Sequence, residues 1–415
     1  MDERTWQKLY DNVSCLPSNP TIVGFNVNLD RIIMVMPALL TSLAFSLPVL
    51  SELRSRLFNS MQTCTAEEWF VTDLDMYRRF SRIFADYGYL VIGGQAGIAA
   101  VHLASTGTSD VLCIAHSAGP ETQNILDNAG VHLLNIQKKR EQSSDTIHLV
   151  FEYVPGIVQV RDGVIPRNNR FIVSPAHLPE SILMPGETMS ELSTGNIPYT
   201  RAFLSGYQYL HTGEEFRQAA DQIRLMKKNN PRMRVHVECV SFTEVSAIHG
   251  FIRNILPAAD SIGLNEHELA ILLRNLAANA EPFFFERMSP VQQVIGALDI
   301  CTKSGLKRLH LHTFGYYVLV TRNDCAHPGA SLNALLVASR AVAQAAQGTH
   351  AEISPIGMSA YRDIEKRFGP PVSEGVFRNA THTIIMIPTI IVKDILKSSG
   401  LGDILSSRAF VADQF

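Results

Sequence analysis

The feature that most constrains the fold of this chain is the alternation of short apolar runs with helix-like segments. Runs typical of strands occur at residues 21–25, 111–115, 234–241 and 261–268. Residues 91–101 combine a strand, a glycine turn and a small-residue helix. Such alternation builds βαβ units with parallel strands. We therefore predict an α/β protein with a central, mostly parallel sheet and helices on both of its faces.

Residues 145–199 depart from this alternation. Three β-rich runs are separated there by turn residues, which predicts an antiparallel meander rather than βαβ units. Four arginines lie within or just after it: Arg161, Arg167, Arg170 and Arg201. Because guanidinium groups suit phosphate, we interpret the segment as a β-rich lid. The alternative is that the arginines are solvated charges that protect a sheet edge.

Length, charge and cysteine content narrow the class of protein. A chain of 415 residues is too long for one simple core without a second domain or lid. The net charge of −3 predicts no binding to nucleic acid or to an anionic membrane surface. The six cysteines lack the spacing of a zinc site, and the polar first residues lack a signal-peptide pattern. We expect free thiols in a cytoplasmic protein.

One apolar stretch competes with that expectation. Residues 32–50 contain no charged side chain and are nearly long enough to span a membrane. Pro37 and Pro48 interrupt the stretch, and no second run of this kind follows. We therefore predict a buried strand or helix pair at a domain junction.

A glycine turn near the C-terminus is the first candidate for chemistry. Gly400 and Gly402 lack a Cβ, so the backbone there can take a positive φ and approach a ligand closely. The apolar-periodic run that follows predicts a helix, whose first N–H groups favour an anion such as phosphate. Asp403 would stand beside that anion and could accept a proton from a hydroxyl group. A simple aspartate cap on a surface helix is the alternative.

Small polar side chains follow the first strand. Asn26, Asn28 and Asp30 alternate at its end, where ligands bind in open α/β sheets. Such side chains can bind sugar hydroxyls, and an Asx turn is the alternative. Gly94 and Gln95 lie in a turn that does not match the dinucleotide fingerprint. We reject a dinucleotide site and expect Gln95 to contact a substrate hydroxyl.

Two carboxylates are expected to face one crevice. Glu238 and Glu268 each lie near the end of a strand in the predicted sheet. With water, they could hold Mg²⁺ bound to phosphate oxygens. A metal, an anion site and a base are the groups that phosphoryl transfer requires. His236 and His267 do not converge on a zinc site, and we interpret them as structural histidines.

Taken together, these motifs resemble the ADP-dependent sugar kinases, the glucokinases and 6-phosphofructokinases within the ribokinase-like superfamily. The motifs that carry the resemblance occur at residues 26–30, 93–98, 236–238, 265–268, 312–313 with 316–317, and 400–403. The resemblance implies two domains. The segments of the large α/β domain would be residues 1–30, 85–144 and 205–415. The segments of the smaller β-rich lid would be residues 31–84 and 145–204.

The resemblance also implies roles for individual residues. Asp403 would be the catalytic base. The backbone around it would hold the transferred phosphate, at Gly400, Leu401 and Gly402. The residues that would organise Mg²⁺ are Glu238, Glu268 and Asn265. The residues that would bind the sugar are Asn28, Asp30, Gly94 and Gln95. The residues that would line the adenine pocket are Pro388, Ile391 and Val392.

The resemblance implies ADP as phosphate donor and Mg²⁺ as cofactor, and the lid distinguishes two acceptors. Arg170 and Arg201 favour fructose 6-phosphate, so we predict a glycolytic 6-phosphofructokinase that makes fructose 1,6-bisphosphate and AMP. Glu68 lies where family glucokinases place a glutamate against glucose, so a glucokinase or a bifunctional enzyme is the second prediction. A non-catalytic sensor and an ATP-dependent nucleoside or vitamin kinase are further alternatives. We expect a monomer or a homodimer.

Overall fold

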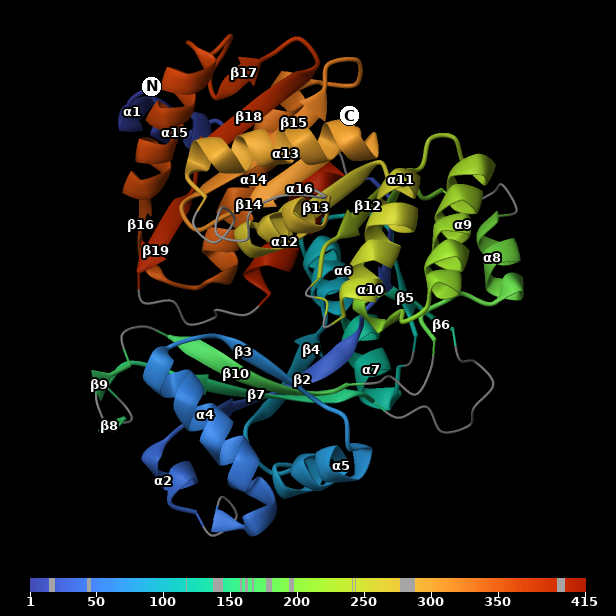
Figure 1. Cartoon of the computed structure of the whole chain (residues 1–415), viewed down its shortest axis with the longest axis vertical. Helices are drawn as coiled ribbons and strands as arrows, with labels where there is room; N and C mark the ends of the chain where they lie inside the picture. The colour runs from blue at the N-terminus through green and yellow to red at the C-terminus, as the bar shows by residue number, and fades with distance from the viewer. Residues whose placement is uncertain are drawn as a thin grey trace.

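The molecule is a mixed α/β structure built around two sheets, as the computed structural model in Figure 1 shows. One sheet has ten strands and the other has five. The predicted fold class, a large α/β unit with a smaller β-rich unit, is confirmed. The structure describes residues 1–14, 19–42, 46–116, 118–136, 145–156, 159–160, 163–165, 168–176, 181–193, 198–240, 242, 244–276, 288–393 and 400–415.

The ten-stranded sheet is parallel from β14 to β6 and antiparallel at the opposite edge. Its strands, in spatial order, are β17 (Val376–Arg378), β18 (His382–Pro388), β15 (Tyr316–Arg322), β14 (Arg308–His312), β13 (Ser261–Asn265), β12 (Arg234–Glu238), β11 (Arg201–Leu204), β1 (Thr21–Phe25), β5 (Val111–Ala115) and β6 (His132–Asn135). All five residues of β1 are buried, as expected for a parallel strand covered on both faces.

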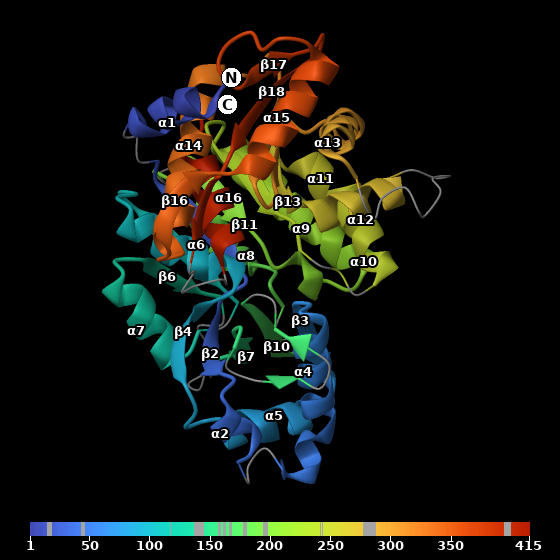
Figure 2. The same cartoon turned by 90° about the vertical axis from the view of Figure 1, so that its left-hand side faces the viewer.

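Helices cover both faces of this sheet (Figures 1 and 2). On one face lie α6 (Gln95–Ser105), α14 (Pro328–Ala345) and α16 (Leu401–Ala412), with α16 packed between the other two. The other face carries α9 (Gly213–Asn229), α12 (Glu266–Leu276), α13 (Pro290–Ser304) and α15 (Pro355–Phe368). The remaining helices of this unit are α1 (Glu3–Asp11), α7 (Pro120–Asn128), α8 (Gly186–Ser193), η2 (Tyr207–Tyr209), α10 (Val245–Gly250), η3 (Phe251–Ile255) and α11 (Leu256–Ala258).

The five-stranded sheet forms a separate unit with its own apolar core (Figure 1). Its strands, in spatial order, are β3 (Glu67–Val71), β10 (Asn169–Pro175), β7 (Ile147–Tyr153), β2 (Asn28–Met34) and β4 (Tyr89–Gly93). Its helices are α2 (Pro37–Leu40), η1 (Pro48–Leu50), α4 (Ser51–Thr63) and α5 (Leu74–Ile83). Two small two-stranded sheets pair β8 (Gln159–Val160) with β9 (Gly163–Val164), and β16 (Thr349–Ile353) with β19 (Ile390–Lys393).

Three details of the smaller unit differ from expectation. The predicted antiparallel meander is only partly correct, because β7 and β10 are antiparallel to each other but parallel to β2 and β3 respectively. The strand β4 joins the five-stranded sheet, although the large domain was expected to resume at residue 85. Conversely, β11 joins the ten-stranded sheet, although the lid was expected to extend to residue 204.

The apolar stretch at residues 32–50 contributes to the core of the smaller unit. Ile33, Val35, Leu39 and Leu50 are buried in that core. The part of the stretch that the structure describes contains the end of β2 and two short helices. No helix among the described residues is long and apolar enough to cross a membrane.

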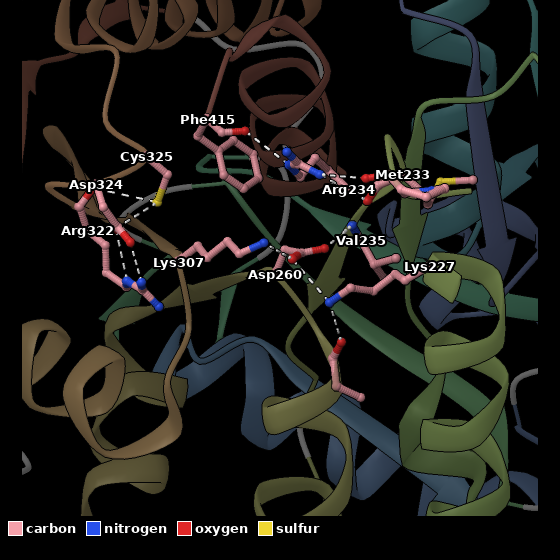
Figure 3. Close-up of polar contacts among 12 residues, drawn as sticks. Lys227, Met233, Arg234, Val235, Asp260, Lys307, Arg322, Asp324, Cys325 and Phe415 are labelled. Atoms are coloured by element: carbon pink, nitrogen blue, oxygen red, sulfur yellow. Dashed lines mark hydrogen bonds and ion pairs between the residues drawn. The ribbon is translucent and has the colours of Figure 1, made fainter. Parts of the chain in front are cut away.

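The segment after α16 is held by hydrogen bonds from arginines of the large sheet. The guanidinium groups of Arg308 and Arg201 donate to the side chain and to the backbone carbonyl of Asp413, at 2.8 and 2.9 Å. Arg234 Nε donates to the backbone oxygen of Phe415 at 3.2 Å (Figure 3). The first residues of three strands of the large sheet, β14, β11 and β12, therefore hold the segment that follows α16.

Candidate active site

The first turn of α16 lies between two cavities. Gly400 caps the helix with φ +72°, and a Cβ on this residue would lie 2.7 Å from Ile98 Cδ1. Glycine is required here by both the left-handed backbone and the close packing on α6. Gly400 and Asp403 line the first cavity, whereas Leu401 and Gly402 line the second. The helix terminus predicted from the glycine turn is therefore in contact with both spaces.

The first cavity has a volume of about 310 Å³ and receives residues from both sheets. The expected site residues that line it are Asn28, Asp30, Glu68, Gly94, Gln95, Arg170, Glu268, Gly400 and Asp403. The structure thus brings together the residues expected to bind sugar, the expected base and one of the two carboxylates expected to hold magnesium.

The floor of the first cavity depends on two glycines at the start of α6. Asn28 Nδ2 donates to Asp30 Oδ1 at 2.7 Å, and these side chains cross the glycine turn. A Cβ on Gly93 would lie 2.3 Å from Asp30 Oδ1, and one on Gly94 would lie 2.7 Å from Asn28 Oδ1. Gln95 Nε2 donates to the Cys239 carbonyl at 3.2 Å. Because the amide nitrogens of Asn28 and Gln95 face these partners, the amide oxygens of both side chains point away from them.

The lid contributes a wall that sequence reasoning largely missed. Ser174 donates to Glu68 Oε1 at 2.7 Å, so its oxygen accepts the proton of His148 Nδ1, 3.1 Å away. His148 lines the cavity, and its Nε2 is therefore an acceptor. Burial, with His116 nearby, lowers the pKa of His148 to about 4, so the ring is neutral. Asn26, which was expected beside Asn28 and Asp30, also lines the cavity, and the lining residues that were not anticipated are Phe70, Ile98, Ile172, Gln208, Tyr209 and Val240.

The structure separates the arginines that were grouped as phosphate ligands. Arg170 lines the first cavity, and its buried Nε has no hydrogen-bond partner among the residues that the structure describes. Arg201 does not: it lies on β11 in the large sheet, 9% exposed, with its guanidinium group on the Thr200 and Asp413 carbonyls. Its expected role at the sugar is therefore wrong. Arg161 and Arg167 lie outside the described residues.

The second cavity, of about 380 Å³, is mainly apolar and lies on the other side of the α16 terminus. Ile391 and Val392, two of the residues expected at an adenine pocket, line it together with Leu401. Pro388 does not: it is buried at the end of β18, where its carbonyl accepts the Tyr10 hydroxyl at 2.7 Å. Lining residues that were not anticipated include Tyr317, Val342, Thr389 and Ile390.

Buried carboxylates lie beside the helix terminus. Burial, together with the nearby charge of Asp403, raises the pKa of Glu268 to about 8 and that of Glu238 well above its ordinary value. Asn265 acts locally as a helix cap: its Oδ1 accepts from the Glu268 N–H at 2.9 Å, while Glu268 Oε2 accepts from the Asn265 N–H at 2.9 Å. The Asn265 side chain is thereby committed to capping α12 and its backbone N–H orients the Glu268 carboxylate, although the residue borders the second cavity.

Mutual repulsion among these carboxylates is the environment that a divalent cation stabilises. Within the described ranges, however, no three histidine, cysteine, aspartate or glutamate side chains are grouped so that they could hold a metal ion. Glu238 and Glu268 fit a magnesium ion only if water and phosphate oxygens complete its coordination, which is usual for this cation.

An α/β large unit and a β-rich lid enclose two cavities that meet at one helix terminus. The conserved region of ADP-specific phosphofructokinases and glucokinases matches residues 19–412 of this chain. The chain belongs to that family.

Similar proteins include both activities of the family. An ADP-dependent glucose/glucosamine kinase of Pyrococcus furiosus is 28% identical, with 99% of this chain and 98% of that protein covered. An ADP-specific phosphofructokinase of Thermococcus litoralis is 26% identical, with 86% and 84% covered. The fold matches a solved ADP-dependent kinase in complex with fructose-6-phosphate and ADPβS at a TM-score of 0.82 and 24% identity, with 99% and 98% covered.

Proposed function

We propose that the protein transfers the β-phosphate of ADP to a hydroxyl of a hexose. The observation that carries this proposal is the position of the α16 terminus, with Asp403 on the polar cavity and Leu401 and Gly402 on the apolar one. The apolar cavity suits a nucleobase, and the polar cavity suits a sugar. A phosphate that passes between them would meet the N–H groups at the start of the helix.

In this mechanism the first turn of α16 supplies both the base and the N–H groups that bind the transferred phosphate. Asp403 accepts the proton of the attacking hydroxyl, and the N–H groups that follow Gly400 stabilise the charge of the transferred phosphate. Asn28 and Asp30 orient the sugar. Glu238 and Glu268 would hold magnesium, which neutralises phosphate charge when it is bound.

Fructose 6-phosphate is the first acceptor that we propose. Arg170 supports it, because its guanidinium group borders the sugar cavity and can pair with a phosphate. The relatives include ADP-specific phosphofructokinases. The position of Arg201 removes one of the two cations expected to favour this substrate.

Glucose is the second candidate, and the acceptor atoms of the cavity favour it. Within the described part of the chain, three buried acceptor atoms have no hydrogen-bond partner: Asn28 Oδ1, Gln95 Oε1 and His148 Nε2. Glu68 adds a carboxylate to the same wall. An unphosphorylated sugar offers a hydroxyl donor to such atoms, and leaving each of them unsatisfied costs about 1–3 kcal/mol.

A donor and acceptor matrix tests both parts of the proposal. The purified protein is assayed with ADP or ATP, and with fructose 6-phosphate or glucose, by measuring nucleotide and sugar-phosphate products. We expect AMP formation with ADP. Turnover with ATP alone would refute the donor assignment, and sugar binding without turnover on any pair would identify a sensor.

Two variants then assign the acceptor. Arg170→Ala should raise the KM for fructose 6-phosphate about tenfold or more and leave that for glucose nearly unchanged, since it removes a charge-assisted contact. Glu68→Gln should show the opposite pattern. If Arg170→Ala leaves fructose 6-phosphate turnover intact, the first choice of acceptor is wrong.

A further inference from the structure

A buried cluster beside the catalytic helix holds one oxygen of Glu238. The Ser406 hydroxyl, on α16, donates to Glu238 Oε2 at 2.5 Å, and His236 Nε2 lies 3.0 Å from the same atom. On the neighbouring strand, a Cβ at Gly263 would lie 2.1 Å from Glu238 Oε2 and 2.4 Å from the Ser406 hydroxyl. A side chain at this position of β13 would therefore displace the contact.

Hydrogen bonds behind His236 determine which of its nitrogens carries the proton. Arg308 Nη1 donates to the Ser261 hydroxyl at 3.0 Å, which directs the hydroxyl proton to His236 Nδ1, 2.8 Å away. With Nδ1 as acceptor, the neutral imidazole has its proton on Nε2 and donates it to Glu238. Two aromatic rings stack on this imidazole, with centroid distances of 5.2 and 4.9 Å: Phe203 and Phe410.

The second oxygen of Glu238 lies on the side of the proposed reaction. Oε1 is 3.9 Å from His312 Nε2. His312 in turn borders the first turn of α16, because its Nε2 is 3.4 Å from the position that a Cβ on Gly402 would occupy. Fixing Oε2 therefore determines where Oε1 is presented.

We propose that Ser406 and His236 are positioning residues that hold Glu238 Oε2 and present Oε1 to the magnesium-bound phosphate. The inference rests on the proposed function and deepens it. Because Ser406 and Asp403 belong to one helix, the same hydrogen bond also fixes the carboxylate relative to the base.

Ser406→Ala tests the hydroxyl, with Ser60→Ala as a control for the loss of a buried serine hydroxyl. Ser60 lies in the lid, where it bonds to Tyr153 and to the Thr65 carbonyl. We expect Ser406→Ala to weaken Mn²⁺ binding about tenfold, measured without turnover by electron paramagnetic resonance, and to raise the Mg²⁺ half-saturation of kcat similarly. The KM for the sugar should change little, and Ser60→Ala should match wild type in both readouts.

A pair of variants at His236 tests the donor. The amide of His236→Gln can replace the Nε2–H donor, whereas His236→Asn is too short to reach Glu238. We expect the glutamine variant to retain more Mn²⁺ affinity than the asparagine variant. Nitrogen-15 spectra of labelled histidine should show the Nε2–H tautomer for the signal that both variants lose. An Nδ1–H tautomer would overturn the assigned direction.

The outcomes separate this inference from the proposed function. If the wild type shows no ADP-dependent turnover, the proposed function fails whatever the variants do. If it turns over and both Ser406→Ala and Ser60→Ala retain its metal affinity, only the positioning role is refuted. If Ser406→Ala fails to fold, the comparison of His236→Gln with His236→Asn decides the matter.

Discussion

Asp403 is the residue at which the proposed chemistry meets its most direct test. It lines the first cavity on the first turn of α16, so Asp403→Asn keeps the shape of the site and removes the proposed base. We expect kcat to fall by at least about 100-fold, the usual contribution of a positioned base, with thermal unfolding unchanged. The exposed Asp299, paired with Lys303 on α13, provides a control: Asp299→Asn should be fully active. A near-wild-type rate for Asp403→Asn would contradict the proposed role of Asp403 as the base.

His148 makes the stability of the protein depend on pH. Burial lowers the pKa of His148 from about 6.5 to about 4. Between these two pH values, the unfolded chain binds a proton at His148 that the folded chain does not bind. Stability therefore falls as pH drops from 6.5 to 4, by about 3 kcal/mol for this group. Urea unfolding between pH 7 and 4 should show a smaller loss for His148→Asn than for wild type. His132→Asn, at an exposed position, should follow wild type; equal slopes for all three would contradict the assignment.

At the scale of elements, the effect of close packing at Gly400, the cap of α16, can be separated from the effect of its left-handed backbone conformation. Gly400 and Gly305 have nearly the same φ, +72° and +73°, but only Gly400 is packed against another side chain, Ile98. Alanine at either position should cost about 1–2 kcal/mol in urea unfolding. Only Gly400→Ala should also move the helix terminus, and we expect its kcat to fall at least tenfold. Equal activity of the two variants would show that the terminus tolerates displacement.

Sequence reasoning succeeded where one element contains the whole signal. The glycine turn before α16 and the polar residues around β2 are local patterns, and their backbone geometry follows from short-range sterics. It failed where sheet membership decides position. Arg201 lies on a short strand that pairs with β1 and β12 rather than with the lid. His148 reaches the cavity through the pairing of β7 with β2 and β10, and such a register is not visible in the sequence.

At the scale of the whole molecule, Asp413 connects the large sheet to the end of α16. It is fully buried, and its side chain accepts from Arg308 at 2.8 Å and from Ser331 at 2.6 Å. Asp413→Ala would leave the buried charge of Arg308 without its partner, which typically costs about 3–5 kcal/mol. The exposed pair of Arg322 and Asp324 (Figure 3) offers a control, since Asp324→Ala should cost no more than about 1 kcal/mol.

The two tryptophans can show which unit loses stability when Asp413 is replaced. Trp6 is buried in the core of the large unit and Trp69 in the separate core of the lid, so Trp69→Phe and Trp6→Phe backgrounds each report on one unit by fluorescence. Asp413→Ala should shift the urea transition seen by Trp6, because the hydrogen bonds of Asp413 to Arg201, Arg308 and Ser331 all lie within the large unit. The transition seen by Trp69 should move far less. Equal shifts of both transitions would show that the lid and the large unit unfold as one cooperative structure. In that case the contacts of Asp413 would also stabilise the wall that the lid contributes to the first cavity.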